Sequence, residues 1–162
     1  MSRALNDLSS QMRPKAFELL ARLNERGVMV MIVDTLRTRA EHAANLAKGT
    51  SKVTLSKHLP RALRGITSTD PDNNEKADAI DVCLYEEWLA HGPDKLNWNS
   101  ADPQWKIVGE EMERLGLRWG GRWLDPVDPG HGELVFAEDV ARTQAERRRG
   151  VITGFPITVA TP

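Results

Sequence analysis

Three residues at separate points of the chain carry side chains that a hydrolytic metal centre uses. His58 follows Ser56 by two positions, Asp81 lies in an apolar run, and His131 follows Asp128 by three positions. A catalytic zinc ion is usually held by three His or carboxylate ligands and keeps a fourth position open for water. Such a site also needs a nearby carboxylate that takes a proton from the water and passes it to the leaving amine.

The surroundings of Asp81 indicate a special role for its carboxylate. In an extended strand, Asp81 shares one face with Ala79, while Ile80 and Val82 point to the other face. A carboxylate on so apolar a strand is costly unless it is paired or bound to a metal.

From the residues alone, each of these side chains could also have a purely structural role. A histidine near a turn is more often a hydrogen-bonded structural residue than a metal ligand. Pro129 and Gly130 indicate a tight turn that could aim Asp128 and His131 into one cleft, but Asp128 could equally be a turn residue. Asp81 could pair with an arginine rather than with a metal.

The pattern of apolar residues predicts the elements that position these side chains. Apolar spacing of three and four favours helices, and continuous apolar runs favour buried strands. The predicted elements, in chain order, are a helix over 13–26 ended by Gly27, a strand over 28–33, a helix from Thr38 to Gly49, a strand over 79–84, a helix after Pro103, a short strand over 134–136 and a basic helix over 142–149. Thr38 and Glu41 fit a capping box at the start of the second helix.

The segment from Arg61 to Lys76 is polar and contains turn-forming residues such as Gly65 and Pro71. This composition predicts an exposed and mobile loop. Because it lies between His58 and Asp81, it is a candidate lip of the cleft.

Composition describes an ordinary globular domain with no sign of a charged partner. The chain has 162 residues, a formal net charge of -1, 40% hydrophobic and 28% charged residues. We expect no nucleic-acid partner and no membrane insertion, since the longest apolar run, 28–33, is far below the roughly 20 residues that a span needs. The single cysteine, Cys83, excludes an intramolecular disulfide and a cysteine-built zinc site.

Several motifs follow one another in the order seen in a known peptidase family. The chain resembles phage L-alanyl-D-glutamate peptidases, which belong with the VanY-type zinc D-alanyl-D-alanine peptidases. The resemblance spans about residues 5 to 136 and rests on Asp7-Leu8, Arg13-Pro14-Lys15-Ala16, Thr35-Leu36-Arg37-Thr38, Ser56-Lys57-His58, Ala79-Ile80-Asp81-Val82, Leu115-Gly116-Leu117, Trp119-Gly120-Gly121-Arg122-Trp123 and Asp128-Pro129-Gly130-His131-Gly132-Glu133.

The resemblance implies a role for individual residues. It makes His58, Asp81 and His131 the zinc ligands and Asp128 the general base. Arg37 would bind a substrate carboxylate or carbonyl, with a surface salt bridge as its alternative, and Ser56 would support that binding. Glu133 could orient a ligand.

Further residues have structural interpretations. We expect His42 to be structural, and we assign no role to His91. Trp119 and Trp123 are expected in the core or in the cleft wall.

Two features depart from the family pattern. Asp81 follows His58 by 23 positions, whereas the family keeps these ligands close together, so Asp78 is a rival for the second ligand. Surface insertions cost little, and the polar segment accounts for the extra length. Gly132 stands where the family commonly has an aromatic residue, which would open the cleft.

The resemblance implies an α+β fold in one domain, with a small antiparallel sheet flanked by helices, of the hedgehog-like D-Ala-D-Ala peptidase type. Residues 1–150 would form the catalytic domain and 151–162 a tail. The implied function is a zinc endopeptidase of peptidoglycan stem peptides, acting as a phage or prophage endolysin. A D-alanyl-D-alanine carboxypeptidase and a non-catalytic cell-wall-binding protein are the alternatives.

The expected setting follows from the same features. No secretory signal is visible, because the run 28–33 begins too far from Met1 and follows a charged stretch. We therefore expect a monomer made in the cytoplasm that reaches the cell wall, periplasmic or extracellular, after release by another factor.

Overall fold

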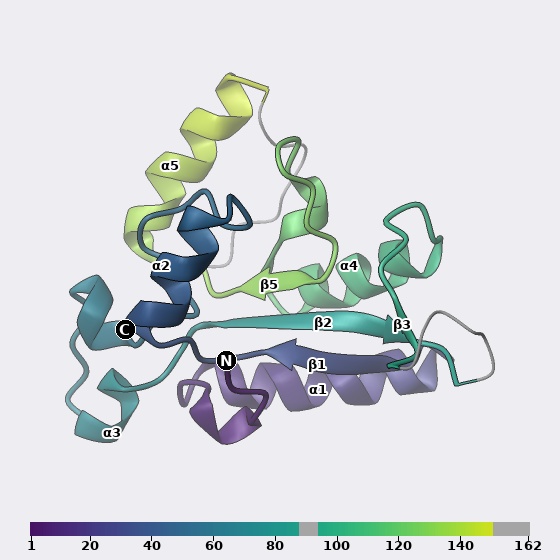
Figure 1. The fold of residues 1–162 in the computed structure, drawn as a ribbon, viewed down its shortest axis with the longest axis horizontal. Helices are drawn as coiled ribbons and strands as arrows, with labels where there is room; N and C mark the ends of the chain where they lie inside the picture. Colours follow the sequence, from purple (N-terminus) through teal and green to yellow (C-terminus); the bar gives the residue numbers. More distant parts are fainter. Residues whose placement is uncertain (88–93, 151–162) are drawn as a thin grey trace.

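The computed structural model describes residues 1–87 and 94–150 and shows one antiparallel sheet with helices packed against it (Figure 1). The elements are η1 (Leu5–Asp7), α1 (Met12–Glu25), β1 (Val30–Asp34), α2 (Arg39–Ala47), η2 (Arg61–Arg64), α3 (Pro71–Asn74), β2 (Ala79–Tyr85), β3 (Leu96–Asn97), α4 (Gln104–Arg114), β4 (Arg118–Trp119), η3 (Gly120–Arg122), β5 (His131–Glu133) and α5 (Ala137–Arg148). The α+β class and the single domain are thus confirmed. The expected tail, 151–162, and His91 lie outside the described residues.

The sheet is built around β2, the longest strand of the described chain. The strand order is β1-β2-β5-β4, and β3 pairs with β2 as well. Asp81 on β2 pairs with Asp34 on β1 and with His131 on β5. A bulge between Ile32 and Asp34 shifts the register of β1 just before this point, and bulges commonly re-aim a side chain. The register therefore places Asp34, Asp81 and His131 in one row across three strands.

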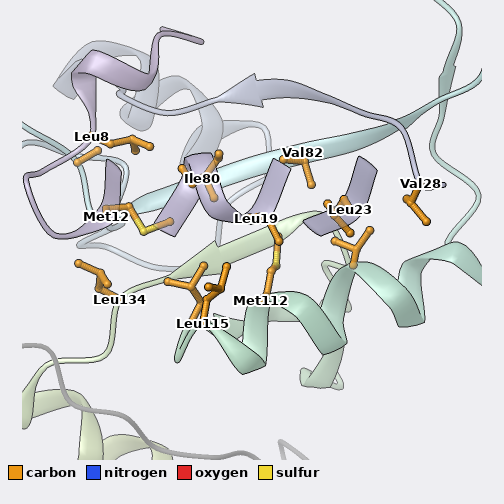
Figure 2. Close-up of a cluster of buried hydrophobic side chains, with 14 of the residues drawn as sticks. Leu8, Met12, Leu19, Leu23, Val28, Ile80, Val82, Met112, Leu115 and Leu134 are labelled. Carbon is orange, nitrogen blue, oxygen red and sulfur yellow. The ribbon is translucent and has the colours of Figure 1, made fainter. Parts of the chain in front are cut away.

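The hydrophobic core lies between the sheet, α1 and α4 (Figure 2). Helix α1 contributes Leu19 and Leu23, which are fully buried as their helical spacing predicts. They meet Val82 from β2 and Met112 from α4 in the same cluster. Burying each such side chain stabilises the fold by about 1.5–3 kcal/mol, so the core fixes the strand that carries Asp81.

Helix α2 begins where the sequence predicts. Thr38 accepts a hydrogen bond from the backbone of Glu41, and the Glu41 side chain accepts one from the backbone of Thr38, so the capping box is confirmed. No helix among the described residues is long and apolar enough to cross a bilayer.

The predicted strand over 134–136 is wrong, because the strand of this region is β5 at His131–Glu133. Leu134 and Phe136 are buried core residues, and the chain leaves the sheet toward α5 at this point. Leu134 continues the pairing by one hydrogen bond, from its backbone N–H to the Asp78 carbonyl at 2.9 Å, and the regular strand ends before it. The basic helix begins at Ala137, five positions earlier than expected.

The prediction of an exposed loop from Arg61 to Lys76 is also partly wrong. The segment contains the short helices η2 and α3, and Arg61 is fully buried. The Arg61 guanidinium binds the buried carboxylate of Asp78 at 2.8 Å, and Arg64 binds the other oxygen of Asp78. The segment is therefore tied to the start of β2 by buried ion pairs, although much of its surface, including Asp70 and Asp72, is exposed.

Candidate metal centre

The candidate metal centre lies where Asp81 and His131 pair across β2 and β5. The third residue, His58, comes from a turn after α2 that hydrogen bonds hold in place. The carbonyl of His58 accepts from the backbone of Arg37 at 2.8 Å, and the carbonyl of Lys57 accepts from the backbone of Asp78 at 2.9 Å. The turn is thus attached to the ends of β1 and β2, which brings His58 to the row formed by the sheet.

The three side chains present one donor atom each to a common point. His58 Nε2 lies 3.1 Å from Asp81 Oδ1 and 3.4 Å from His131 Nδ1. His131 Nδ1 lies 2.8 Å from Asp81 Oδ1. Ligands about 2.0–2.2 Å from one tetrahedral zinc ion are about 3.3–3.6 Å apart, so these three donor atoms need only small outward shifts to surround a metal ion. This is the one group of at least three His, Cys, Asp or Glu side chains in the described residues that could hold a metal ion.

In each imidazole, the ring nitrogen that faces away from the common point makes a hydrogen bond that fixes the orientation of the ring. His58 Nδ1 donates to the carbonyl of Thr35 at 2.8 Å, so Nε2 is the ring nitrogen that faces Asp81 and His131. His131 Nε2 lies 3.1 Å from Glu133 Oε2, which leaves Nδ1 on the side of Asp81. Partners of this kind set the tautomer and the ring orientation of metal-binding histidines.

Arg37 connects Asp81 to Asp34. Its Nη2 donates to Asp81 Oδ2 at 2.9 Å, and its Nε donates to Asp34 Oδ2. Arg37 is mostly buried, so the alternative of a surface salt bridge does not describe it. Asp34 is buried as well, and burial raises the pKa of its carboxyl group against the opposing effects of His58 and Arg37. The guanidinium therefore orients Asp81 and leaves Oδ1 facing the two histidines.

Charge at the site favours a cation between these groups. Burial would raise the pKa of Asp81, but His58 and His131 hold it well below its usual range. Burial opposes a charge on His131, yet the hydrogen bonds to Asp81 and Glu133 raise its pKa to about 10. The pKa of Glu133 is lowered, because Lys57 and His131 outweigh the effect of burial. Two carboxylates thus hold a proton on His131, and a metal cation at Nδ1 would take the place of that proton.

Asp128 approaches the same centre from the loop before β5. Burial raises the pKa of its carboxyl group, and His131 opposes this effect. The loop packs closely on η3, where the Asp128 backbone donates to the Gly120 carbonyl at 3.1 Å. A Cβ at Gly120 would lie 2.4 Å from the Asp128 carbonyl oxygen, so only glycine permits this approach.

These residues line one pocket of about 210 Å³. His58, Asp81 and His131 share its wall with Arg37, Ser56 and Asp128. Its rim is formed by two loops, 50–55 and 123–128, which are linked by a salt bridge of 2.6 Å between Lys52 and Asp125. No residue from 61–76 lines this pocket, so the expectation that this segment forms the lip is wrong.

The rival ligand Asp78 points away from the metal centre. Its carboxylate is fully buried and binds Arg61, Arg64 and the hydroxyl of Ser9. Asp78 and Asp81 thus lie on opposite faces of the chain, as strand alternation predicts.

The expected effect of Gly132 is wrong. A Cβ at this position would lie 2.9 Å from Met112 Sδ, so position 132 faces the core rather than the cleft. Gly132 therefore makes room for Met112 and does not widen the pocket.

Other predicted residues have identifiable roles. Ser56 accepts a hydrogen bond from the His58 backbone at 3.3 Å and lines the pocket. Trp119 packs on the core, whereas the Trp123 ring lies 5.1 Å from the His131 ring in the pocket wall. His42 is buried with Nε2 3.0 Å from the carbonyl of Thr54, which agrees with a structural role.

Sequence reasoning missed Asp34 and Arg118. Asp34 ends an apolar strand, as Asp81 interrupts one, and this shared feature was the available signal. Arg118 lines the pocket, lies 3.5 Å from Glu133 and stacks over Trp123 at 5.3 Å. A single arginine beside the tryptophan motif gives no comparable signal.

Known proteins share both sequence and fold with this chain. A family model described as D-alanyl-D-alanine carboxypeptidase matches residues 75–134, which include Asp81, Asp128 and His131. The L-alanyl-D-glutamate peptidase of Listeria phage A118 is 29% identical over 136 residues, covering 82% of this chain and 40% of the relative. A ribonuclease H from Aliivibrio salmonicida (strain LFI1238) is 35% identical over 77 residues, 43% of this chain and 46% of that protein. The chain therefore spans less than half the length of either relative.

A solved structure shows the same fold. The L-Ala D-Glu endopeptidase ChiX of Serratia marcescens superimposes with a TM-score of 0.55 and 16% identity, covering 83% of this chain and 86% of ChiX. The resemblance to the D-alanyl-D-alanine carboxypeptidase family and to L-alanyl-D-glutamate peptidases, which the order of the motifs predicts, is therefore confirmed.

Proposed function

We propose that this chain is a zinc-dependent peptidase that hydrolyses an amide bond in peptidoglycan stem peptides. The observation that carries the proposal is the convergence of His58, Asp81 and His131, whose donor atoms lie 2.8–3.4 Å from one another in the wall of a pocket. A set of two histidines and one carboxylate with an open side is typical of catalytic zinc.

The donor atoms favour zinc over magnesium or calcium. Imidazole nitrogen suits zinc and related transition metals, whereas magnesium and calcium prefer oxygen ligands. Both imidazoles are held by partners on their outer nitrogens, which supports ligand roles for His58 and His131. When bound, zinc supplies Lewis acidity to a water molecule and to the scissile carbonyl.

The remaining residues of the pocket would move the proton and hold the substrate. We assign Asp128 as the general base, because its half-buried carboxyl group lines the pocket three positions before His131. It would take the proton of the attacking water and deliver it to the leaving amine. Arg37 would orient Asp81 and meet a substrate carboxylate or carbonyl, and Ser56 would support the turn that carries His58.

The names of the related proteins support the choice of bond. Both the Listeria phage relative and ChiX are named for the L-alanyl-D-glutamate bond, and the phage relative aligns with most of this chain. We therefore propose this bond first and D-alanyl-D-alanine carboxypeptidase activity as the alternative, because the matching family model carries that description. The proposed setting is the bacterial cell wall, and the proposed unit is a monomer.

A nuclease function is less well supported. The match to a ribonuclease H covers 43% of this chain. Within the described residues, the possible metal group contains two histidines and one carboxylate, which is not the oxygen-rich set that magnesium-dependent phosphoryl transfer favours.

Digestion of purified peptidoglycan tests the proposal. The zinc-loaded protein should release peptides whose new amino terminus is D-glutamate, which mass spectrometry after amine labelling identifies. Release of free D-alanine would instead identify the carboxypeptidase. Binding to peptidoglycan without any new terminus would support the non-catalytic wall-binding alternative and overturn the proposal.

The His58→Ala variant serves as the matched control. It removes one donor from the metal group, so it should bind zinc weakly and produce no new termini. A chelator should abolish the activity of the wild type, and added zinc should restore it. Activity that persists in the variant or in the chelated protein would show that hydrolysis does not use this site.

A further inference from the structure

A buried lysine, Lys57, lies beside the metal centre and is not one of the candidate ligands. The Lys57 side chain is 8% exposed, and its Nζ donates to the carboxylate of Asp139 and to the carbonyl of Leu134. The same Nζ lies 3.8 Å from Glu133 Oε1. Its cation therefore faces two buried carboxylates, one on β5 and one on α5.

These contacts form a continuous path from α5 to the metal centre. Asp139 lies in the first turn of α5, where it also accepts a hydrogen bond from the Phe136 backbone at 2.9 Å. Lys57 joins Asp139 to Glu133, and Glu133 Oε2 lies 3.1 Å from His131 Nε2. Lys57 thus immediately precedes one assigned ligand in the chain and reaches the other through one carboxylate.

Burying the ammonium group of Lys57 costs free energy, and a contribution to stability alone does not explain why a lysine stands here. Taking an ammonium group out of water is expensive, and a buried ion pair is often no more stabilising than an apolar pair of the same size. A methionine at position 57 could pack on the Phe136 ring, which Lys57 Nζ approaches to 5.1 Å. Arg118 Nη1 lies 3.5 Å from Glu133 Oε1, and Lys57 adds a second cation at the same oxygen. The two cations hold Oε1, so that Oε2 stays in contact with the imidazole of His131.

We infer that Lys57 is a positioning residue for the metal centre, and that α5 completes the centre by anchoring Lys57 through Asp139. The inference rests on the proposed function, because it assumes that His131 is a metal ligand. Helix α5 lies beyond residues 75–134, the part of the chain that the family model matches.

Zinc affinity measured without substrate tests the inference. Lys57→Met should raise the dissociation constant for zinc about tenfold, the lower end of the effect seen when partners of metal ligands are removed. Lys57→Arg keeps the charge and should restore most of the affinity. Lys76→Met is the matched control, because Lys76 pairs with Asp7 at 3.9 Å outside the pocket, and its zinc affinity should stay at the wild-type value.

Two further measurements separate positioning from general stability. The visible absorption spectrum of the cobalt-loaded protein reports the ligand geometry, and it should change in Lys57→Met but not in Lys76→Met. Asp139→Asn should shift zinc affinity and the spectrum in the same direction, and should add little in the Lys57→Met background, because both act through Glu133. If Lys57→Met does not fold, Asp139→Asn and Lys57→Arg decide the question.

The outcomes distinguish this inference from the proposed function. Wild-type zinc binding with unchanged affinity and cobalt spectrum in Lys57→Met and Asp139→Asn would overturn the inference and leave the proposed function standing. A zinc-binding wild type with the expected shifts, but without peptidase activity, would support the inference and overturn the proposed reaction. A wild type that binds no zinc would overturn both.

Discussion

Zinc binding should expel a proton from His131. Its imidazole contacts Asp81 Oδ1 through Nδ1 at 2.8 Å and Glu133 Oε2 through Nε2 at 3.1 Å. Burial opposes the charge, but these two carboxylates raise the pKa of His131 to about 10. Because Nδ1 is also the atom assigned to the metal, zinc and the proton compete for one position.

The size of the effect follows from this pKa. At pH 7.5 a group with a pKa of about 10 is almost fully protonated, so each zinc ion should release about one proton. The apparent association constant should rise about tenfold per pH unit as long as the pH stays below that pKa. The raised pKa also stabilises the metal-free fold, and this contribution is complete below about pH 6.5 and is lost as the pH rises through about 10.

Calorimetric titration with zinc in buffers of different ionisation enthalpy measures the released protons directly. Experiments between pH 6.5 and 8.5 avoid zinc hydroxide. Glu133→Gln removes one of the two charges that hold the proton, so this variant should release fewer protons than the wild type near the upper end of the range. Glu110→Gln, a surface carboxylate paired with Arg26 at 2.9 Å, is the control and should match the wild type. Zinc affinity that does not depend on pH, with no proton released, would refute the assignment of the proton to His131.

Three other perturbations test the site and the fold. Asp128→Asn should keep its zinc and its melting temperature but lose on the order of 10²–10⁴ in rate, because it cannot accept the proton. His131→Ala should lose both metal and activity. An active Asp128→Asn would show that Asp128 is only a turn residue. Gly120→Ala should lower the free energy of unfolding by about 1–3 kcal/mol in denaturant titrations and should reduce zinc content, because its Cβ meets the Asp128 carbonyl. An unchanged free energy of unfolding and zinc content would contradict the close packing. Burial raises the pKa of the Cys83 thiol to about 12, so a disulfide reagent should react with Cys83 at pH 8 only in unfolded protein. Fast reaction of the native protein would contradict the burial of Cys83.

Long periodic segments could be predicted from the sequence, whereas short ones could not. Helix α1 and strand β2 have apolar patterns that extend over several turns or residues, and Thr38 marks the start of α2 by its capping partner. Strands β3 and β4 have two residues each, too few to show a period. The apolar pattern misleads at residues 134–136, because a buried chain leaving a sheet is as apolar as a strand.

The ligands of the candidate site could also be predicted from the sequence, whereas contacts between residues far apart in the chain could not. The order of the motifs brought His58, Asp81 and His131 together as expected ligands, and the structure places their donor atoms side by side. The contacts of Asp34 depend on a bulge in β1 and on its register with β2, neither of which leaves a pattern in the sequence. The burial of Arg61 likewise depends on Asp78, a partner that lies 17 positions away in the chain.

The row of side chains across β1, β2 and β5 makes the spacing of the ligands independent of the length of chain between them. Hydrogen bonds between strands fix the separation of Asp81 from His131, and backbone bonds from Arg37 and Asp78 fix the turn that carries His58. A connection can therefore lengthen, as between His58 and Asp81, without moving a donor atom. The rim loop 50–55 carries none of the candidate ligands and no assigned base, so exchanging its residues should alter which peptides are accepted while the metal geometry is conserved.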